Sequence, residues 1–197
     1  MPRPARYDND AILDVALKLV DEHGPGGLTT EALAREMGGN VGSIYYRFPS
    51  RDHVAAQLWM RCIRAGQAGM IAALATEGEN AALEAAALHY PRWSREDLPV
   101  ARVLATRGRD HLVTRWPEDL DGDLKTLNDG LLAATRDFTR RWYGSTTKVH
   151  RQTVAFALLD LPVAAIRPYL AAGKSPPRHL DRAILAAAHA ALGDQAG

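Results

Sequence analysis

Cysteine is almost absent from this sequence, and neither sign of charge is in clear excess. Cys62 is the single cysteine among 197 residues, which excludes an internal disulfide and a metal site built from several thiolates. The 24 lysines and arginines nearly balance the 23 aspartates and glutamates, so the net charge of +1 carries no overall nucleic-acid signal. A disulfide-stapled scaffold and a zinc finger are therefore excluded, and any DNA-binding role must rest on the placement of particular residues.

Long apolar runs are also missing. No stretch approaches the roughly 18 uninterrupted apolar residues of a membrane-spanning helix, and residues 1–6 lack the apolar core of a signal peptide. We therefore expect a cytoplasmic protein without a membrane partner. Phosphate-binding glycine loops, nucleophile elbows and zinc-protease motifs are absent as well, so we expect neither an enzyme nor a cofactor or metal site.

The abundant residues are helix formers. The chain has 34 alanines, whereas aromatic residues make up only 7% of it. Apolar residues recur at helical spacing between glycine and proline breaks, which predicts an all-α fold of about nine helices and no strand. The expected helices are 8–23, 29–36, 41–48, 50–78, 79–90, 94–107, 117–144, 146–170 and 178–192.

The first three predicted helices form a compact unit over residues 8–51. Gly38, Gly39 and Asn40 provide a tight turn between the second helix and the third. The third helix, 41–48, carries no acidic residue, and it offers a hydroxyl, two phenols and a guanidinium that suit phosphate or base contacts. A short, polar and aromatic third helix of this kind is typical of a helix-turn-helix unit that inserts one helix into the major groove.

Two segments of this unit resemble the tetracycline-repressor (TetR) family of bacterial transcription regulators. They are Leu28–Gly38, with the sequence LTTEALAREMG, and Asn40–Arg51, with the sequence NVGSIYYRFPSR. Gly39 departs from the family pattern, in which an apolar residue is common at this position. The resemblance implies that Tyr45 and Arg51 bind phosphates, that the N-terminal part of the helix approaches bases, and that Phe48 packs beneath the unit. The full set of predicted DNA-binding residues is Thr30, Asn40, Val41, Ser43, Tyr45, Tyr46, Arg47 and Arg51.

The resemblance also implies the layout of the remaining chain. Residues 1–52 would form the helix-turn-helix DNA-binding domain, and residues 53–197 an all-helical domain for effector binding and dimerisation. The last two long helices would pair with those of a second subunit in a four-helix bundle. The residues assigned to this homodimer interface are Phe156, Leu159, Val163, Ile166, Ile184, Ala188 and Leu192.

Candidate effector contacts lie in the middle of the chain, where we expect a pocket within residues 56–145. Apolar and aromatic residues at helical spacing are as often core residues as ligand contacts, so both interpretations stay open here. The same holds for two histidines that are suited to hydrogen bonding in a cavity. The candidate residues are Met70, His89, Trp93, His111, Trp116, Phe138 and Trp142.

These patterns predict a ligand-responsive transcriptional regulator. We expect a repressor that binds a palindromic operator as a homodimer and is released by a small-molecule effector. The alternative is a helical small-molecule-binding or catalytic protein whose DNA-binding domain is degenerate. The effector, the operator and the choice between repression and activation are left open by the sequence.

Overall fold

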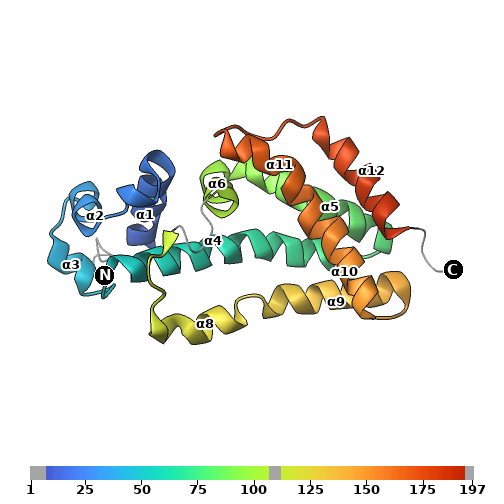
Figure 1. The fold of residues 1–197 in the computed structure, drawn as a ribbon, viewed down its shortest axis with the longest axis horizontal. Coiled ribbons are helices and arrows are strands. Elements are labelled where there is room, and N and C mark those ends of the chain that lie inside the picture. The colour runs from blue at the N-terminus through green and yellow to red at the C-terminus, as the bar shows by residue number, and fades with distance from the viewer. Residues whose placement is uncertain (1–7, 107–111, 194–197) are drawn as a thin grey trace, which may run out of the picture.

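The computed structural model describes residues 8–106 and 112–193, and every regular element in those ranges is helical. The predicted all-α class is thereby confirmed. Three helices form the N-terminal unit: α1 (Asn9–His23), α2 (Thr30–Met37) and α3 (Val41–Tyr45), with a short 3-10 turn η1 (Pro25–Gly27) between the first two. The long helix α4 (Arg51–Leu74) then runs from this unit through the middle of the molecule (Figure 1).

Local sequence signals start each of these four helices. The side chains of Asp8, Thr29, Asn40 and Ser50 accept hydrogen bonds from the backbone N–H three residues further on, over 2.7 to 3.3 Å. Each cap satisfies one of the N–H groups that a helix start leaves without a partner. The helix-turn-helix geometry is therefore encoded within a few residues of each boundary.

The remaining helices build a larger C-terminal unit around the second half of α4. They are α5 (Glu79–Glu96), α6 (Leu98–Thr106), the short η2 (Glu118–Leu120), α8 (Asp121–Thr126), α9 (Asp129–Tyr143), α10 (Lys148–Ala155), the π-helical turn η3 (Phe156–Asp160), α11 (Leu161–Ala171) and α12 (Leu180–Leu192). Figure 1 shows α6 lying between α1 and the C-terminal helices. The predicted domain boundary at residues 52 and 53 falls at the start of α4, which runs through both units, and it stays a prediction.

Several predicted helix boundaries differ in the structure, and the third helix ends at Tyr45 rather than at residue 48. Helix α5 passes through Pro91 and ends at Glu96, although we expected Pro91 to break it. Pro91 is buried and α5 packs against α4, α6, α11 and α12, so tertiary packing outweighs the loss of one backbone hydrogen bond. The expected helix 117–144 is divided, with α8 ending at Thr126 and α9 beginning at Asp129. Pro162 and Pro168 lie inside α11 without ending it.

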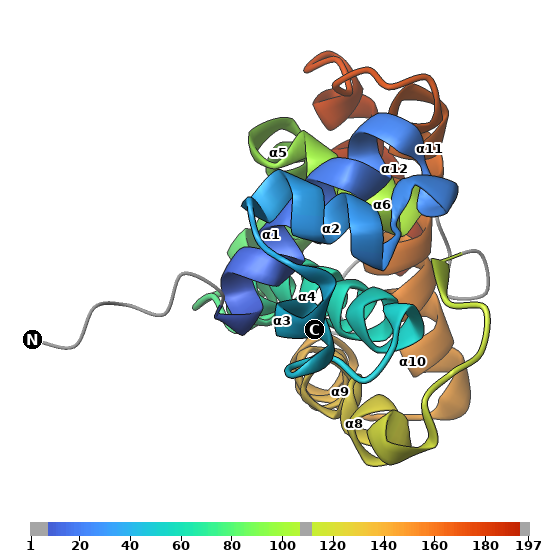
Figure 2. The same ribbon diagram turned by 90° about the vertical axis from the view of Figure 1, so that its left-hand side faces the viewer.

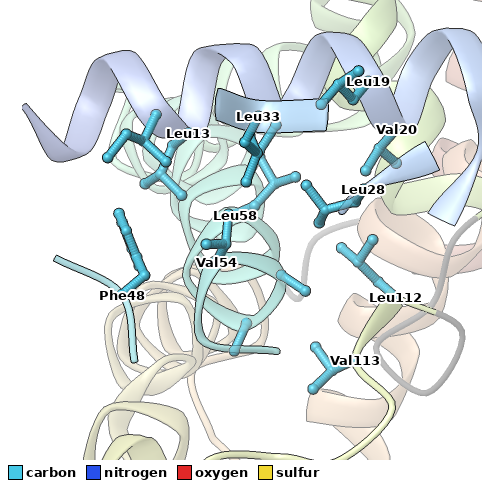
Figure 3. Packing of buried hydrophobic residues seen from close by; sticks show 14 of the residues in the cluster. Leu13, Leu19, Val20, Leu28, Leu33, Phe48, Val54, Leu58, Leu112 and Val113 are labelled. Atoms are coloured by element: carbon cyan, nitrogen blue, oxygen red, sulfur yellow. The ribbon is translucent and has the colours of Figure 1, made fainter. Parts of the chain in front are cut away.

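The N-terminal unit has its own apolar core. Figure 3 shows Leu13, Leu33, Phe48 and Leu58 converging from α1, α2, the loop after α3, and α4. Phe48 is fully buried, as the resemblance implied. Leu112 and Val113, which follow α6 in the chain, complete the same cluster from the C-terminal unit, so the two units share one core.

Helices α4 and α5 approach each other closely because α4 carries glycine at two contact points. A Cβ added at Gly69 would lie 2.3 Å from the His89 ring, and one added at Gly66 would lie 3.3 Å from the Trp93 ring. The bare backbone leaves room for both rings. The helix pair is thus held together by aromatic side chains of α5 lying on the glycines of α4.

The segment Lys148–Ala171 is continuous helix through α10, η3 and α11. It is long and apolar enough to cross a membrane by length and composition alone, with a mean hydropathy of 1.5. Val154, Leu158 and Ile166 are buried against the other helices, whereas Val149 and Phe156 are exposed apolar residues. Other helices of the chain cover one side of this helix, whereas apolar side chains on its other side are exposed.

Candidate nucleic-acid interface and ligand cavity

The turn between α2 and α3 is shaped by Gly38. This residue has φ 64° and ψ 35°, in the left-handed region that glycine adopts without strain. The Gly39 N–H donates to the Ala34 carbonyl over 2.9 Å, which closes the end of α2. Asn40 then caps α3, with its Oδ1 accepting from the Ser43 N–H at 2.9 Å and from Ser43 Oγ at 3.2 Å. The turn therefore fixes the direction in which α3 leaves the unit.

Two tyrosines project from α3 and its end. Tyr46 is 87% exposed and Tyr45 is 49% exposed, and α2 and α3 form one end of the molecule (Figure 2). Thr30 is buried, and its Oγ1 lies 3.5 Å from the Tyr45 hydroxyl, so it positions that phenol. Arg47 donates to Asn9 Oδ1 over 3.4 Å. The end of the unit thus presents hydroxyl and guanidinium groups without a carboxylate on α3 itself.

Of the eight predicted DNA-binding residues, most lie on or beside this surface. Val41, Ser43 and Arg47 are half-buried, and Asn40 is exposed at the start of α3. Their contacts with DNA stay predictions. Arg51 differs from the exposed residues, because its side chain is only 26% exposed and its guanidinium is bonded to partners within the chain.

Arg51 joins three segments of the chain. Its guanidinium donates to the carbonyls of Pro25 at 2.9 Å, Leu28 at 3.1 Å and Leu112 at 2.6 Å, and it pairs with Asp52 at 2.8 Å. The first two carbonyls belong to the loop between α1 and α2, and the third belongs to the segment after α6. Phosphate binding by Arg51 stays a prediction from resemblance, whereas the structure shows an internal tie between the two units.

The two residues after Arg51 strengthen the same connection. Asp52 accepts from the backbone N–H groups of Thr114 at 3.2 Å and Arg115 at 2.8 Å. Burial acts to raise the pKa of Asp52, but the bonds from Arg51 and from these N–H groups outweigh it and lower the pKa below its usual value. His53 lies 3.0 Å from Asp119. The start of α4 therefore binds residues 112–119 through three consecutive side chains.

Helix α6 has two packed faces. Val100 and Val103 belong to the core of the N-terminal unit, and Arg102 forms an ion pair with Asp21 of α1 at 2.8 Å. Ala101 and Leu104 line a cavity that α6 forms with α5 and α11, and Leu104 also packs against the core of the N-terminal unit. A change in the cavity can therefore reach α1 through one short helix.

The cavity between α5, α6 and α11 has a volume of about 170 Å³. Three helices contribute side chains, nearly all of them apolar or aromatic, and one arginine lies among them. The lining residues are Tyr90, Trp93, Ser94, Ala101, Leu104, Ala105, Val163, Ile166, Arg167 and Leu170. An apolar cavity with few polar groups is the usual form of a small-molecule site.

Among the six predicted effector contacts that the structure describes, Trp93 alone lines the cavity. Met70, Phe138 and Trp142 are buried in a separate core cluster, where they pack against one another and against α10 and α12. Trp116 contacts Trp59 edge-on at 6.2 Å and lies beside a charged hollow near Asp52 and His53. His111 lies outside the described residues. The expected pocket within residues 56–145 therefore lacks one wall of this cavity, because α11 lies outside that range.

His89, which the sequence offered as a candidate ligand contact, forms a hydrogen bond within the protein. Its Nε2 donates to the Gly66 carbonyl over 2.8 Å, and burial lowers the pKa of the ring, which keeps it neutral. Cys62 is likewise a packing residue, because burial raises the pKa of its thiol to about 12 and leaves it protonated. Neither residue faces the cavity.

Four of the seven predicted dimer residues are buried within the single chain. Ile184 is 2% exposed, and Ile166, Ala188 and Leu192 are buried with it in the core of the single chain, against α5 and neighbouring helices. Leu159 and Val163 are half-buried, whereas Phe156 is 52% exposed. An amphipathic pattern identifies an apolar helix face, and here α5 of the same chain covers most of that face.

Sequence reasoning missed Tyr90, Arg167 and the alanines of α6 as cavity residues. Their signal was weak, because alanine and a single arginine on a helix carry no motif. Arg167 lies on α11, far in sequence from the other walls. Only the packing of α11 against α5 and α6 brings these residues together.

Comparison with known proteins finds a family match for the N-terminal unit and similar folds for the chain. Residues 12–58 match the family described as bacterial regulatory proteins, tetR family. No curated protein sequence matches the chain. The fold is similar to that of the fatty acid degradation regulator FadR from Bacillus halodurans, with a TM-score of 0.70 at 15% identity, covering 94% of this chain and 98% of that one.

Two further solved structures have the same fold. The TetR family transcriptional regulator PfmR from Thermus thermophilus has a TM-score of 0.69 at 16% identity, covering 94% of this chain and 99% of that one. FadR from Bacillus subtilis, solved in complex with stearoyl-CoA, has a TM-score of 0.67 at 14% identity, covering 92% and 97%. Residues 12–58 therefore match the model of the tetR family of bacterial regulatory proteins, and the chain shares its fold with solved structures that include a TetR family transcriptional regulator.

Proposed function

We propose that this chain is a transcriptional regulator that binds a two-fold symmetric DNA site as a homodimer and responds to a small molecule. The observation that carries the proposal is the capped unit α1–α3, which matches the tetR family and exposes Tyr45 and Tyr46 at its end. A rigidly held helix with exposed phenols and a neighbouring arginine suits the major groove and its phosphates. Release of the DNA by the effector, and hence repression, is the direction that the resemblance implies.

A second copy of the chain is the partner that we propose for the uncovered side of α10 and α11. Val149 and Phe156 are exposed there, on a helix whose other side is already packed. Helix α12 lies beside α11 and exposes Ala183, Ala186 and Ala190, small residues that allow another helix to approach closely. A two-fold pairing of this surface would place two copies of α3 symmetrically for a palindromic site.

A small molecule acts in this proposal through α6. An effector shifts an equilibrium only by binding one arrangement of the protein more tightly than another. A ligand in the cavity would contact Ala101 and Leu104, while Val100 and Arg102 of the same helix contact the N-terminal unit. The stearoyl-CoA complex of FadR from Bacillus subtilis supports a small-molecule effector for a chain of this fold.

Tyr46 provides the direct test of DNA binding. DNA fragments would be selected from a random pool by the immobilised protein, and affinity for the selected site would be measured by fluorescence anisotropy at several salt concentrations. We expect Tyr46→Ala to weaken binding about three- to tenfold, because the variant loses a hydrogen bond at the interface. Tyr169→Ala, on α11, is the matched control and should bind as the wild type does.

Two results would contradict the proposal. One is a pool that yields no enriched sequence, with only weak, salt-sensitive binding to any DNA. The other is an enriched site whose affinity is unchanged in Tyr46→Ala. Either result would favour a helical ligand-binding protein with a degenerate DNA-binding unit.

A further inference from the structure

The size of the cavity between α5, α6 and α11 limits what it can hold. Its volume is about 170 Å³. An engineered cavity of about 150 Å³ in another protein binds benzene, so this one holds a single ring with a few additional atoms. A long acyl chain would extend beyond this volume. Ala101 and Ala105 are the small residues of α6 that leave the space open.

The walls of the cavity suit an aromatic ring. Tyr90 and Trp93 of α5 meet edge to face, with ring centroids 6.3 Å apart and an interplanar angle of 68°. Leu104 and Ile166 contribute aliphatic surface from α6 and α11. A third ring inserted among these groups would gain both burial and edge-to-face contacts.

The charge of the cavity is set by Arg167. No aspartate or glutamate is among the described residues that line it. The other arginines close to this region are already paired, Arg95 with Asp181 at 2.7 Å and Arg102 with Asp21 at 2.8 Å. Arg167 is exposed at the cavity edge, and the described residues offer it no ion pair. A guanidinium in this position favours an anion and disfavours a cation.

Two hydroxyl groups complete the polar lining. Ser94 Oγ already donates to the Pro91 carbonyl over 3.0 Å. Burial raises the pKa of Tyr90, so its phenol is neutral at physiological pH and can donate a hydrogen bond. The cavity therefore combines an aromatic interior with two donors, Tyr90 and Arg167, that suit a carboxylate.

We propose that this cavity binds a compact aromatic carboxylate, with the ring between Trp93 and Ile166 and the carboxylate on Arg167. The inference names the effector class of the proposed regulator and in that respect rests on the proposed function. The binding itself involves no DNA, so the two proposals can fail separately.

Phenylacetate is the probe, and its binding to the full chain would be measured by calorimetry without DNA. Phenylethyl alcohol keeps the ring without charge, phenethylamine reverses the charge, and palmitate keeps the carboxylate on a long chain. We expect phenylacetate to bind most tightly, the alcohol about tenfold or more weakly, and the amine and palmitate not measurably. Equal binding of phenylacetate and the alcohol, or tighter binding of palmitate, would overturn the proposal.

Two cavity variants and one control variant locate the site. Arg167→Gln should weaken phenylacetate binding about tenfold while leaving the alcohol unaffected, and Arg182→Gln, an exposed arginine on α12 outside the cavity, should change neither. Ala105→Phe should fill the cavity and abolish binding of both probes, with a cooperative melting transition verifying that it is folded. Unchanged phenylacetate binding in Arg167→Gln would exclude this cavity, and binding lost equally in Arg182→Gln would exclude the specific role of Arg167.

A regulator assay separates the two proposals. If phenylacetate binds in the cavity but leaves the affinity for selected DNA unchanged, the ligand site stands and the proposed coupling fails. If selected DNA is bound and phenylacetate and its analogues are not, the DNA-binding role stands and the ligand class is wrong.

Discussion

At the start of α4, one side chain connects parts of the chain that lie far apart in sequence. Arg51 holds the carbonyls of Pro25 and Leu28 on one side and that of Leu112 on the other. A guanidinium has five N–H donors in a fixed plane, which lets one residue serve several carbonyls at once. Lysine, with a flexible stem and a single ammonium, would not satisfy all of them in the same way.

Arg51→Gln is therefore expected to act on stability. The variant leaves carbonyl groups in a part-buried place without their charged donor, at a cost of about 2 kcal/mol. Urea unfolding measures this loss, and Arg35→Gln, at an exposed arginine on α2, is the comparison. If Arg51 serves only this internal connection, the salt dependence of DNA binding stays the same per subunit. A stable Arg51→Gln variant whose salt slope falls by about one would instead identify Arg51 as a phosphate contact.

Among the helices, α6 links the cavity to the N-terminal unit. Its Arg102 pairs with Asp21 of α1, while its Ala101, Leu104 and Ala105 line the cavity. The two side chains of this pair are partly exposed, so the pair adds little to global stability. In the proposed function this ion pair matters because it connects α6, which lines the cavity, with α1 of the DNA-binding unit.

Breaking this pair should weaken the response to a ligand more than it weakens DNA binding. In Arg102→Gln, operator affinity without effector should stay within a few-fold of the wild type, whereas the ligand-induced loss of affinity should shrink, because a coupling contact is gone. Anisotropy with and without effector measures both quantities. Arg140→Gln, in an exposed pair on α9, should leave both unchanged. Full effector response in Arg102→Gln would show that coupling takes another route.

At the scale of the whole molecule, the next prediction concerns the pairing of two chains through the exposed side of α10 and α11. Phe156→Glu would place a charge in the proposed interface, where it would be buried without a partner, and should give folded monomers by light scattering. Leu132→Glu, at an exposed leucine of α9, should stay a dimer. Since one half-site offers few contacts, the monomer should lose most of its operator affinity. A Phe156→Glu variant that remains dimeric would place the interface elsewhere.

The footprint of the protein on DNA should have the two-fold symmetry of the proposed dimer. Two copies of α3 related by a two-fold axis should protect half-sites about one helical turn apart, on the order of 34 to 36 Å or slightly more. Protection without two-fold symmetry would contradict a homodimer independently of any variant.

The helical class, most helix boundaries and the helix-turn-helix unit could be predicted from the residues alone. These features depend on close neighbours in the chain: Asp8, Thr29, Asn40 and Ser50 cap their own helices, and Gly38 permits the left-handed turn that follows α2. Local hydrogen bonds and backbone sterics act over three or four residues, so a single sequence is enough to read them.

Only the tertiary structure shows which apolar helix faces pack against each other. Ile184 and Phe156 both lie on apolar stripes of late helices, yet α5 and its neighbours bury the first and the second stays exposed. In the same way, Arg51 faces inward and Arg167 reaches a cavity whose walls come from three helices. Helical periodicity shows that a face is apolar, but the partner that covers it depends on packing between segments far apart in the chain.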